Sequence, residues 1–178
     1  MNKYYFTTSI NFLLFLFFNL AYPVPIIKDF CSQDTPPITK LIELNWSKLF
    51  TYASFNPGVV NNILVNKRPG NYADYDKQLI IKVLYDDETN IIIGFITYYY
   101  INAHTCNIEL LAIDQAYRAQ GHGTKLIEHV QAQAQKAGAQ FLQLYVYTSN
   151  PKAIELYTHL GFQTKQRLPG CLLLSKKI

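Results

Sequence analysis

The stretch 107–123, NIELLAIDQAYRAQGHG, constrains the fold of this chain more than any other. It begins with an apolar run, passes through a polar loop and reaches Gly121 and Gly123 directly before an amphipathic helix. The first turn of a helix leaves backbone N–H groups unpaired, and the helix dipole favours negative charge at that end. Because glycine has no Cβ, a ligand can approach its backbone closely. The stretch therefore predicts a strand, a loop and a helix that together form an anion-binding site.

Two common phosphate-binding loops do not fit this stretch. The dinucleotide-binding spacing G-x-G-x-x-G would need a third glycine where the chain has Leu126, and the P-loop spacing G-x-x-x-x-G-K-S/T does not occur. The spacing that remains is R-x-x-G-x-G, in which Arg118 precedes Gly121 by three residues. The anion site is therefore of another kind.

Strands are expected on both sides of this unit. Runs rich in β-branched and aromatic residues predict strands at 79–85, 91–101, 107–113, 140–147, 162–166 and 171–176. The first three follow one another through short turns, which suits an antiparallel meander, and Gly94 inside the second indicates a bulge or close packing. The run Tyr98-Tyr99-Tyr100 is interpreted as ordinary sheet surface and core rather than as the lining of a cleft.

Helical spacing marks two further segments. Leu126, Ile127 and Val130 recur at helical spacing up to a stop at Gly138, and a second helix is predicted from Asn150 as N-cap to Gly161. Residues 38–46 suit either a strand or a helix, residues 47–65 suit one or two short helices interrupted at 56–58, and 66–76 suit a loop.

A second motif occupies residues 150–162, NPKAIELYTHLGF, with the spacing N-x-x-A-x-x-x-Y-x-x-x-G-F. Together with R-x-x-G-x-G after an apolar strand, it resembles the GNAT N-acetyltransferase superfamily. The resemblance implies an α/β fold in layers, with a mixed, mostly antiparallel central sheet and helices on both faces. It also implies an acyl-CoA cleft where the strands at 108–113 and 140–147 splay apart.

The resemblance implies acetyl-CoA as co-substrate and an amine as acceptor. Backbone N–H groups would hold the pyrophosphate, Arg118 would add charge-assisted bonds, and an N–H of Leu111 or Ala112 would stabilise the oxyanion. Tyr157 would protonate the departing thiolate, or else would only pack against the cofactor. The implied cofactor-binding residues are Leu111, Ala112, Ile113, Arg118, Gln120, Gly121, His122, Gly123, Thr124, Asn150 and Tyr157.

Glu109 is the candidate base that takes a proton from the acceptor amine. It alternates with Leu111 and Ile113, so its side chain is expected on the face that bears them. The alternatives are a solvated glutamate at the end of a strand and a water chain as base. The acceptor itself, whether a small molecule or a protein amine, is not encoded in any motif of the chain.

Composition limits the remaining function classes. The net charge of +4 over 178 residues permits anionic ligands but lacks the clustered basic footprint of a nucleic-acid binder. Three cysteines without C-x-x-C spacing predict neither a zinc site nor a complete disulfide framework. His122 is interpreted as a loop residue and His129 as a helix-surface residue, so no metal is expected. A non-catalytic CoA-binding or interaction module is the alternative function.

The N-terminus predicts a targeting segment. Lys3 is the only charged residue before Lys28, and residues 10–20 form a short apolar run. Such a run suits a signal peptide or an uncleaved membrane anchor at 1–22, with 4–22 able to contact a membrane, although a buried helix or a misplaced start is an alternative. Residues 23–37 are expected as a linker and 38–178 as the N-acetyltransferase domain. Export and a cytosolic catalytic domain both remain open, as does the oligomeric state.

Overall fold

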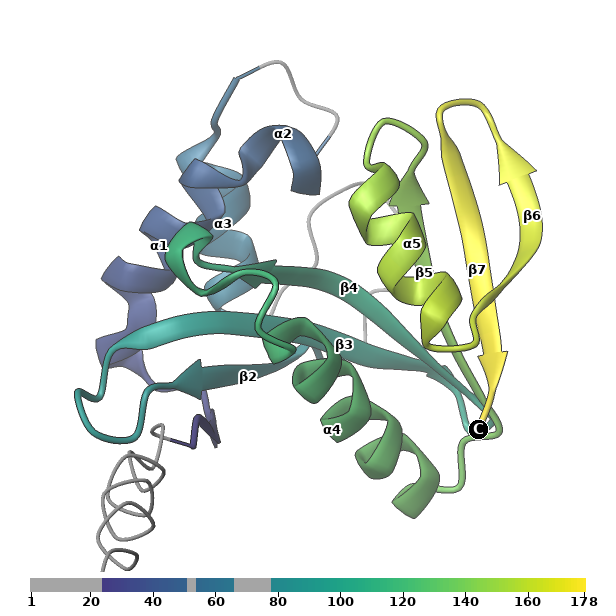
Figure 1. Cartoon of the computed structure of the whole chain (residues 1–178), viewed down its shortest axis with the longest axis horizontal. Coiled ribbons are helices and arrows are strands. Elements are labelled where there is room, and N and C mark those ends of the chain that lie inside the picture. The colour runs from purple at the N-terminus through teal and green to yellow at the C-terminus, as the bar shows by residue number, and fades with distance from the viewer. Residues whose placement is uncertain (1–23, 51–53, 66–77) are drawn as a thin grey trace, which may run out of the picture.

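The computed structural model describes residues 24–50, 54–65 and 78–178, which form one seven-stranded sheet and its helices (Figure 1). The sheet has the order β1-β2-β3-β4-β5-β7-β6, and β4 with β5 is its parallel pair. The strands are β1 (Ile26–Asp29), β2 (Ile80–Tyr85), β3 (Ile92–Asn102), β4 (Thr105–Ile113), β5 (Phe141–Tyr147), β6 (Gln163–Leu168) and β7 (Cys171–Lys177). The mixed, mostly antiparallel sheet expected from the sequence is confirmed.

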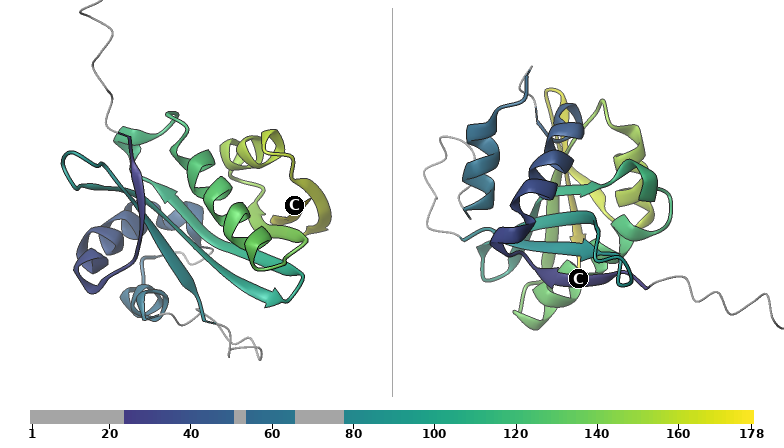
Figure 2. Two further views of the ribbon diagram at one scale, coloured as in Figure 1. Left: turned by 90° about the horizontal axis from the view of Figure 1, so that it is seen from below. Right: turned by 90° about the vertical axis from the view of Figure 1, so that its left-hand side faces the viewer.

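Helices cover both faces of this sheet, as expected. They are α1 (Thr35–Leu44), α2 (Trp46–Leu49), α3 (Pro57–Leu64), α4 (His122–Lys136) and α5 (Pro151–His159), with 3-10 turns η1 (Ser32–Asp34) and η2 (Gln115–Tyr117). One buried core joins the sheet to α4 and α5, and a second joins it to α1, α2 and α3. Figure 2 shows these two helical layers on opposite sides of the strands. Alternate residues of β2, β3 and β4 supply the two cores, because successive side chains of a strand point to opposite faces.

The expected linker at 23–37 contains regular structure, which corrects the prediction. Strand β1 lies in it and pairs antiparallel with β2, from Ile26 opposite Tyr85 to Asp29 opposite Lys82. The two prolines that suggested a linker stand in the first turn of α1. Proline is tolerated there because that turn has no intrahelical use for the missing N–H. Residues 38–46, open between strand and helix, belong mainly to α1.

Two short helices, α2 and α3, follow α1. Asn56 caps α3, since its Oδ1 accepts from the backbone N–H of Gly58 at 2.9 Å and of Val59 at 3.4 Å. The Asn-Pro-Gly sequence therefore starts a helix rather than interrupting one. The predicted loop at 66–76 and the N-terminal segment at 1–22 lie outside the described residues. In the described segments, no helix has the length and hydropathy to cross a membrane.

Gly94 explains how β3 and β4 approach each other. A Cβ on Gly94 would lie 2.5 Å from Ile113 Cδ1 and 2.9 Å from the Ala112 carbonyl oxygen, so a larger residue would push β4 away. The pairing of β3 with β2 also shifts register beside it, after Leu84. Close packing and a bulge, given as alternatives, therefore both occur. Tyr98 and Tyr99 are buried in the sheet, as interpreted.

Candidate functional site

The parallel strands β4 and β5 pair at one end and separate at the other. Their register runs from Thr105 opposite Phe141 to Ile108 opposite Leu144 and stops there. Beyond this point β4 stays paired with β3, and β5 stays paired with β7 as far as Tyr147. Figure 1 shows β4 and β5 diverging in this region. Pairing with β3 and β7 thus holds β4 and β5 apart beyond Ile108 and Leu144, and we call this separation of the two strands the fork. The splay predicted between these strands is present.

Backbone N–H groups of β4 point into this fork at alternate residues. The N–H of Leu110 donates to Thr97 Oγ1 at 3.0 Å, and the N–H of Asp114 donates to the Ile93 carbonyl at 2.9 Å, so both point toward β3. Successive N–H groups of a strand point to opposite edges. The N–H groups of Leu111 and Ile113 therefore face the fork, whereas that of Ala112 faces β3. This selects Leu111 over Ala112 as a donor to a ligand between the strands.

A β-bulge changes the position of Glu109. Residue Ile108 pairs with Tyr98 while Leu110 pairs with the preceding Thr97, so Glu109 is the extra residue in β4. A bulge interrupts the alternation of side chains along a strand.

The two cores show the consequence of the bulge. Ile108 packs in the core beneath α4 and α5 together with Leu111, and Leu110 packs in the opposite core. The alternation that placed Glu109 with Leu111 and Ile113 therefore does not hold at this point. Instead, Glu109 lies beside Asn107, whose Nδ2 donates to Glu109 Oε2 at 3.2 Å. The carboxylate is at the fork, but for a different geometric reason.

The glycine loop leads into α4 as predicted. Gly121 is the N-cap and has φ of +80°, which glycine adopts without strain. A Cβ on Gly123 would contact Leu156 of α5 and Leu111 of β4, so this glycine lies between the fork and α5. No side chain caps this helix start and no acidic residue stands in its first turn. The N–H groups from Gly121 to Thr124 and the positive end of the helix dipole are thus suited to an anion.

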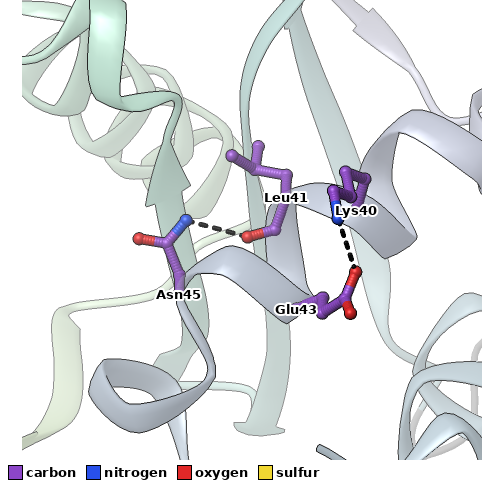
Figure 3. Close-up of polar contacts among 4 residues, drawn as sticks. All are labelled: Lys40, Leu41, Glu43 and Asn45. Carbon is purple, nitrogen blue, oxygen red and sulfur yellow. Dashed lines mark hydrogen bonds and ion pairs between the residues drawn. The ribbon is translucent and has the colours of Figure 1, made fainter.

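Arg118 contacts the protein rather than extending from the loop. Its Nε donates to the Ile113 carbonyl at 3.1 Å, and its Nη2 donates to Asn45 Oδ1 at 2.7 Å. Asn45 is buried at the end of α1, where its Nδ2 donates to the Leu41 carbonyl at 2.8 Å (Figure 3). These contacts form a brace between α1 and the glycine loop, and the contact of Arg118 with phosphate oxygens stays a prediction. Sequence gave no signal for Asn45, which lies 73 residues from Arg118.

Tyr157 is buried on α5, and its ring meets Phe162 edge-on at 5.8 Å between centroids. Burial raises the pKa of Tyr157 to about 12, so the phenol stays protonated near neutral pH. Asn150 caps the same helix, because its Oδ1 accepts from the Ala153 N–H at 3.4 Å. The structure thus gives Asn150 a capping contact. Tyr157 follows Leu156, whose side chain adjoins Gly123, so α5 brings Tyr157 near the glycine loop.

The histidines differ in their surroundings. His122 is the first residue of α4, and burial followed by the charge of Lys125 lowers its pKa. His129, expected at the surface, is half-buried, and its Nε2 is enclosed without a hydrogen-bond partner. Burial, and then the charge of Lys82, lowers the pKa of His129. Across 24–50, 54–65 and 78–178, no group of His, Cys, Asp and Glu side chains could hold a metal ion.

Comparison with known proteins gives a family match. The profile of the Acetyltransferase (GNAT) family matches residues 43–162, more than half of the chain. The ribosomal protein bS18-alanine N-acetyltransferase of Escherichia coli K12 is 44% identical over 52 residues, which are 29% of this chain and 35% of that protein. The thialysine N-epsilon-acetyltransferase of Mus musculus is 31% identical over 91 residues, 49% of this chain and 54% of that protein. The aligned parts thus span a third to about a half of these relatives.

A solved structure is similar over a larger part of the chain. The PaiA N-acetyltransferase from Thermoplasma acidophilum, in complex with coenzyme A, superposes with a TM-score of 0.66. The match covers 87% of this chain and 99% of that chain at 16% identity. At this identity the likeness shows the fold alone.

Proposed function

Because the chain belongs to the GNAT acetyltransferase family, we propose that it transfers an acetyl group from acetyl-CoA to an amine by direct attack. The observation that supports this most directly is the fork between β4 and β5 beside an uncapped helix start. A thioester arm fits between two strands with unused backbone groups, and a pyrophosphate fits at the N-terminus of a helix. Acyl transfer needs both groups of one donor to be held at once.

The donor would be held mainly by backbone groups. The N–H groups from Gln120 to Thr124 would bind the pyrophosphate, and the N–H of Ile113 would pair with the pantetheine arm. The N–H of Leu111, which faces the fork, would bind the carbonyl oxygen of the thioester as negative charge develops on it. Arg118 would act indirectly, by fixing the loop through Ile113 and Asn45.

The departing sulfur would take its proton from Tyr157. An ordinary thiol has a pKa near 8.5, and against that value a phenol with a pKa of about 12 is a poor proton donor. Burial in this same core, however, raises the pKa of the Cys106 thiol to about 12. Enclosure at the fork would raise the pKa of a coenzyme thiol in the same direction and so reduce the difference between the thiol and Tyr157. Glu109, at the fork, would accept the proton that the amine loses.

The names of two relatives support the proposed acceptor class. One acts on an alanine of a ribosomal protein and the other on the ε-amine of thialysine, and both acceptors are amines. These names support an amine acceptor for this chain without selecting between a protein and a small molecule.

The test uses the purified full chain. We expect acetyl-CoA to raise the melting temperature, and an amine panel (an alanine-starting peptide, a lysine amide and a polyamine) to release thiol from it. A rise in melting temperature without thiol release would favour the non-catalytic CoA-binding module. The proposal is wrong altogether when acetyl-CoA neither binds nor reacts.

A further inference from the structure

One buried oxygen at the fork has no partner. Among the described residues, the buried side-chain atoms without a hydrogen bond are Asn107 Oδ1 and His129 Nε2. Asn107 is 0% exposed and lies one residue before the point where β4 and β5 separate. Leaving a buried acceptor unpaired is costly, so such atoms in native proteins call for an explanation.

The orientation of the Asn107 amide is determined by its surroundings. Its Nδ2 donates to the Ile108 carbonyl and to Glu109 Oε2, each at 3.2 Å. Both partners are acceptors only, so exchanging the amide nitrogen and oxygen would place oxygen against oxygen. The unpaired atom is therefore the carbonyl oxygen, and only an N–H or O–H donor can satisfy it.

The neighbours of Asn107 form a polar floor to the fork on the α1–α3 face of the sheet. Asn107 pairs with Tyr99, which packs in the core beneath α1, α2 and α3. On β5 its register partner is Gln143, also buried, and Tyr145 follows on the same face with 54% of its surface exposed. The bulge brings Glu109 to this floor from β4. The Glu109 carboxylate, which accepts from the Asn107 amide nitrogen, and the unpaired amide oxygen thus belong to one cluster where the strands part.

We propose that Glu109 and Asn107 together bind the acceptor as a protonated primary amine, which donates one N–H to each. The proposal rests on the proposed function, and it makes Asn107 a specificity-determining residue. An ammonium is the simplest group that offers two N–H donors and a charge opposite to that of the carboxylate. Reaching the enclosed oxygen requires side chains at the fork to move, so binding itself must be measured.

The arrangement also accounts for the protons of the reaction. One N–H bond of the ammonium breaks and its proton goes to the Glu109 carboxylate, which frees the nitrogen lone pair. That pair forms the new C–N bond at the thioester carbon, and the C–S bond then breaks. The nitrogen passes its second proton to solvent water, sulfur takes a proton from Tyr157 as the C–S bond breaks, and Tyr157 regains a proton from water. Throughout, a remaining N–H bonded to Asn107 Oδ1 would keep the lone pair directed at the carbonyl carbon.

Calorimetry on the full chain saturated with coenzyme A tests this without chemistry. The probes are Nα-acetyl-lysine amide and an alanine-starting peptide, each paired with its trimethylammonium form, which keeps the charge but has no N–H on that nitrogen. We expect at least one primary amine to bind about a hundredfold more tightly than its trimethylated form, because trimethylation removes both hydrogen bonds and each is worth about tenfold. Asn107→Leu should weaken the primary amine about tenfold and leave the trimethylated form unchanged.

Two further variants guard against a folding defect. Asn107→Asp keeps an acceptor oxygen at similar volume and should keep the discrimination between the two forms. Asn62→Leu, at an exposed position of α3, is the matched control. Equal binding of both forms, unchanged discrimination in Asn107→Leu, or no binding of either primary amine would overturn the proposal. Failure of the proposed function would be seen separately, as absence of coenzyme A binding or of thiol release by the wild-type chain.

Discussion

The two sides of the fork differ in the groups they offer to a ligand: one side offers main-chain groups and the other offers side chains. On the side of the glycine loop, the groups suited to a ligand are main-chain N–H groups of β4 and of the start of α4. On the α1–α3 face, the groups are the side chains of Asn107 and Glu109, placed there by a bulge. A backbone site depends on chain conformation, which glycines and helix starts mark in a sequence. A side-chain site depends on register and packing, which no short motif records.

Proline substitutions in β4 should give the largest effect. Leu111→Pro removes the N–H that faces the fork, so we expect kcat to fall about 10²–10³-fold, the usual loss for one oxyanion donor. The ladder to β3 does not use this N–H, so the protein should still fold. Ala112→Pro removes an N–H directed at β3 and should instead lower the melting temperature strongly. Thiol-release kinetics and thermal unfolding of both variants measure the contrast, and the reverse result would place the donor at Ala112.

The same contrast explains what sequence could predict. The glycine spacing, the N-cap Asn150 and the runs of strand-forming residues are local, so the strands and the starts of α4 and α5 followed from the residues, whereas the mixed sheet followed from the resemblance to the GNAT family. The bulge at Glu109 did not, because nothing in ELLAI distinguishes an extra residue from a regular strand. Because of the bulge, the side chains do not alternate regularly between Ile108 and Leu111, so the face of Glu109 could not be predicted from the sequence.

Distant contacts were equally out of reach of sequence. The spacing of Arg118 to Gly121 is local and predicts a contact with the ligand, whereas its partner Asn45, at the end of α1, lies 73 residues away in the sequence. The two prolines in the first turn of α1 predict a linker when only the sequence is considered, because proline is common both in linkers and in first helical turns. Whether the prolines belong to a linker or to a helix depends on whether β1 pairs with the edge of the sheet, and that pairing is a tertiary contact that local sequence does not determine.

Tyr157 is the side chain that we propose to act on the glycine-loop side of the fork. Tyr157→Phe keeps the ring and its contact with Phe162, and we expect kcat to fall about 10²-fold if the hydroxyl protonates sulfur. Because burial raises the pKa of Tyr157 to about 12, the acid form persists as the pH rises and is lost only near that value. The wild-type rate should therefore show no alkaline decline from Tyr157 between pH 8 and pH 10. Pre-steady-state thiol release measures both, and an unchanged rate in the variant would leave Tyr157 a packing role.

Substitution of Asn45 tests whether acetyl-CoA binding on the glycine-loop side can be weakened without an effect on the reacting groups. Asn45→Ala removes the acceptor for Arg118 Nη2, and hydrogen bonds to charged groups are worth about 1.5–3 kcal/mol. We expect the dissociation constant of acetyl-CoA to rise about tenfold with little change in kcat, because the loop loses its brace while the reacting groups stay in place. Combined with Arg118→Ala in a double-mutant cycle, the two effects should not add. Additive losses, with Asn62→Ala as the exposed control, would show that the brace does not act on the loop.

Asn150 should give the smallest effect and the clearest separation of roles. Its Oδ1 caps α5, and loss of an N-cap costs about 1 kcal/mol of stability. Asn150→Ala should therefore lower the free energy of unfolding by about that amount. Asn150→Asp should restore it, because aspartate caps equally well. Neither variant should change acetyl-CoA binding at a temperature where both are folded. Weaker binding by both would instead mean that the asparagine amide touches the cofactor. Asn150 would then be a cofactor ligand on the glycine-loop side of the fork, whereas its contact in the structure assigns it only to capping the helix that carries Tyr157.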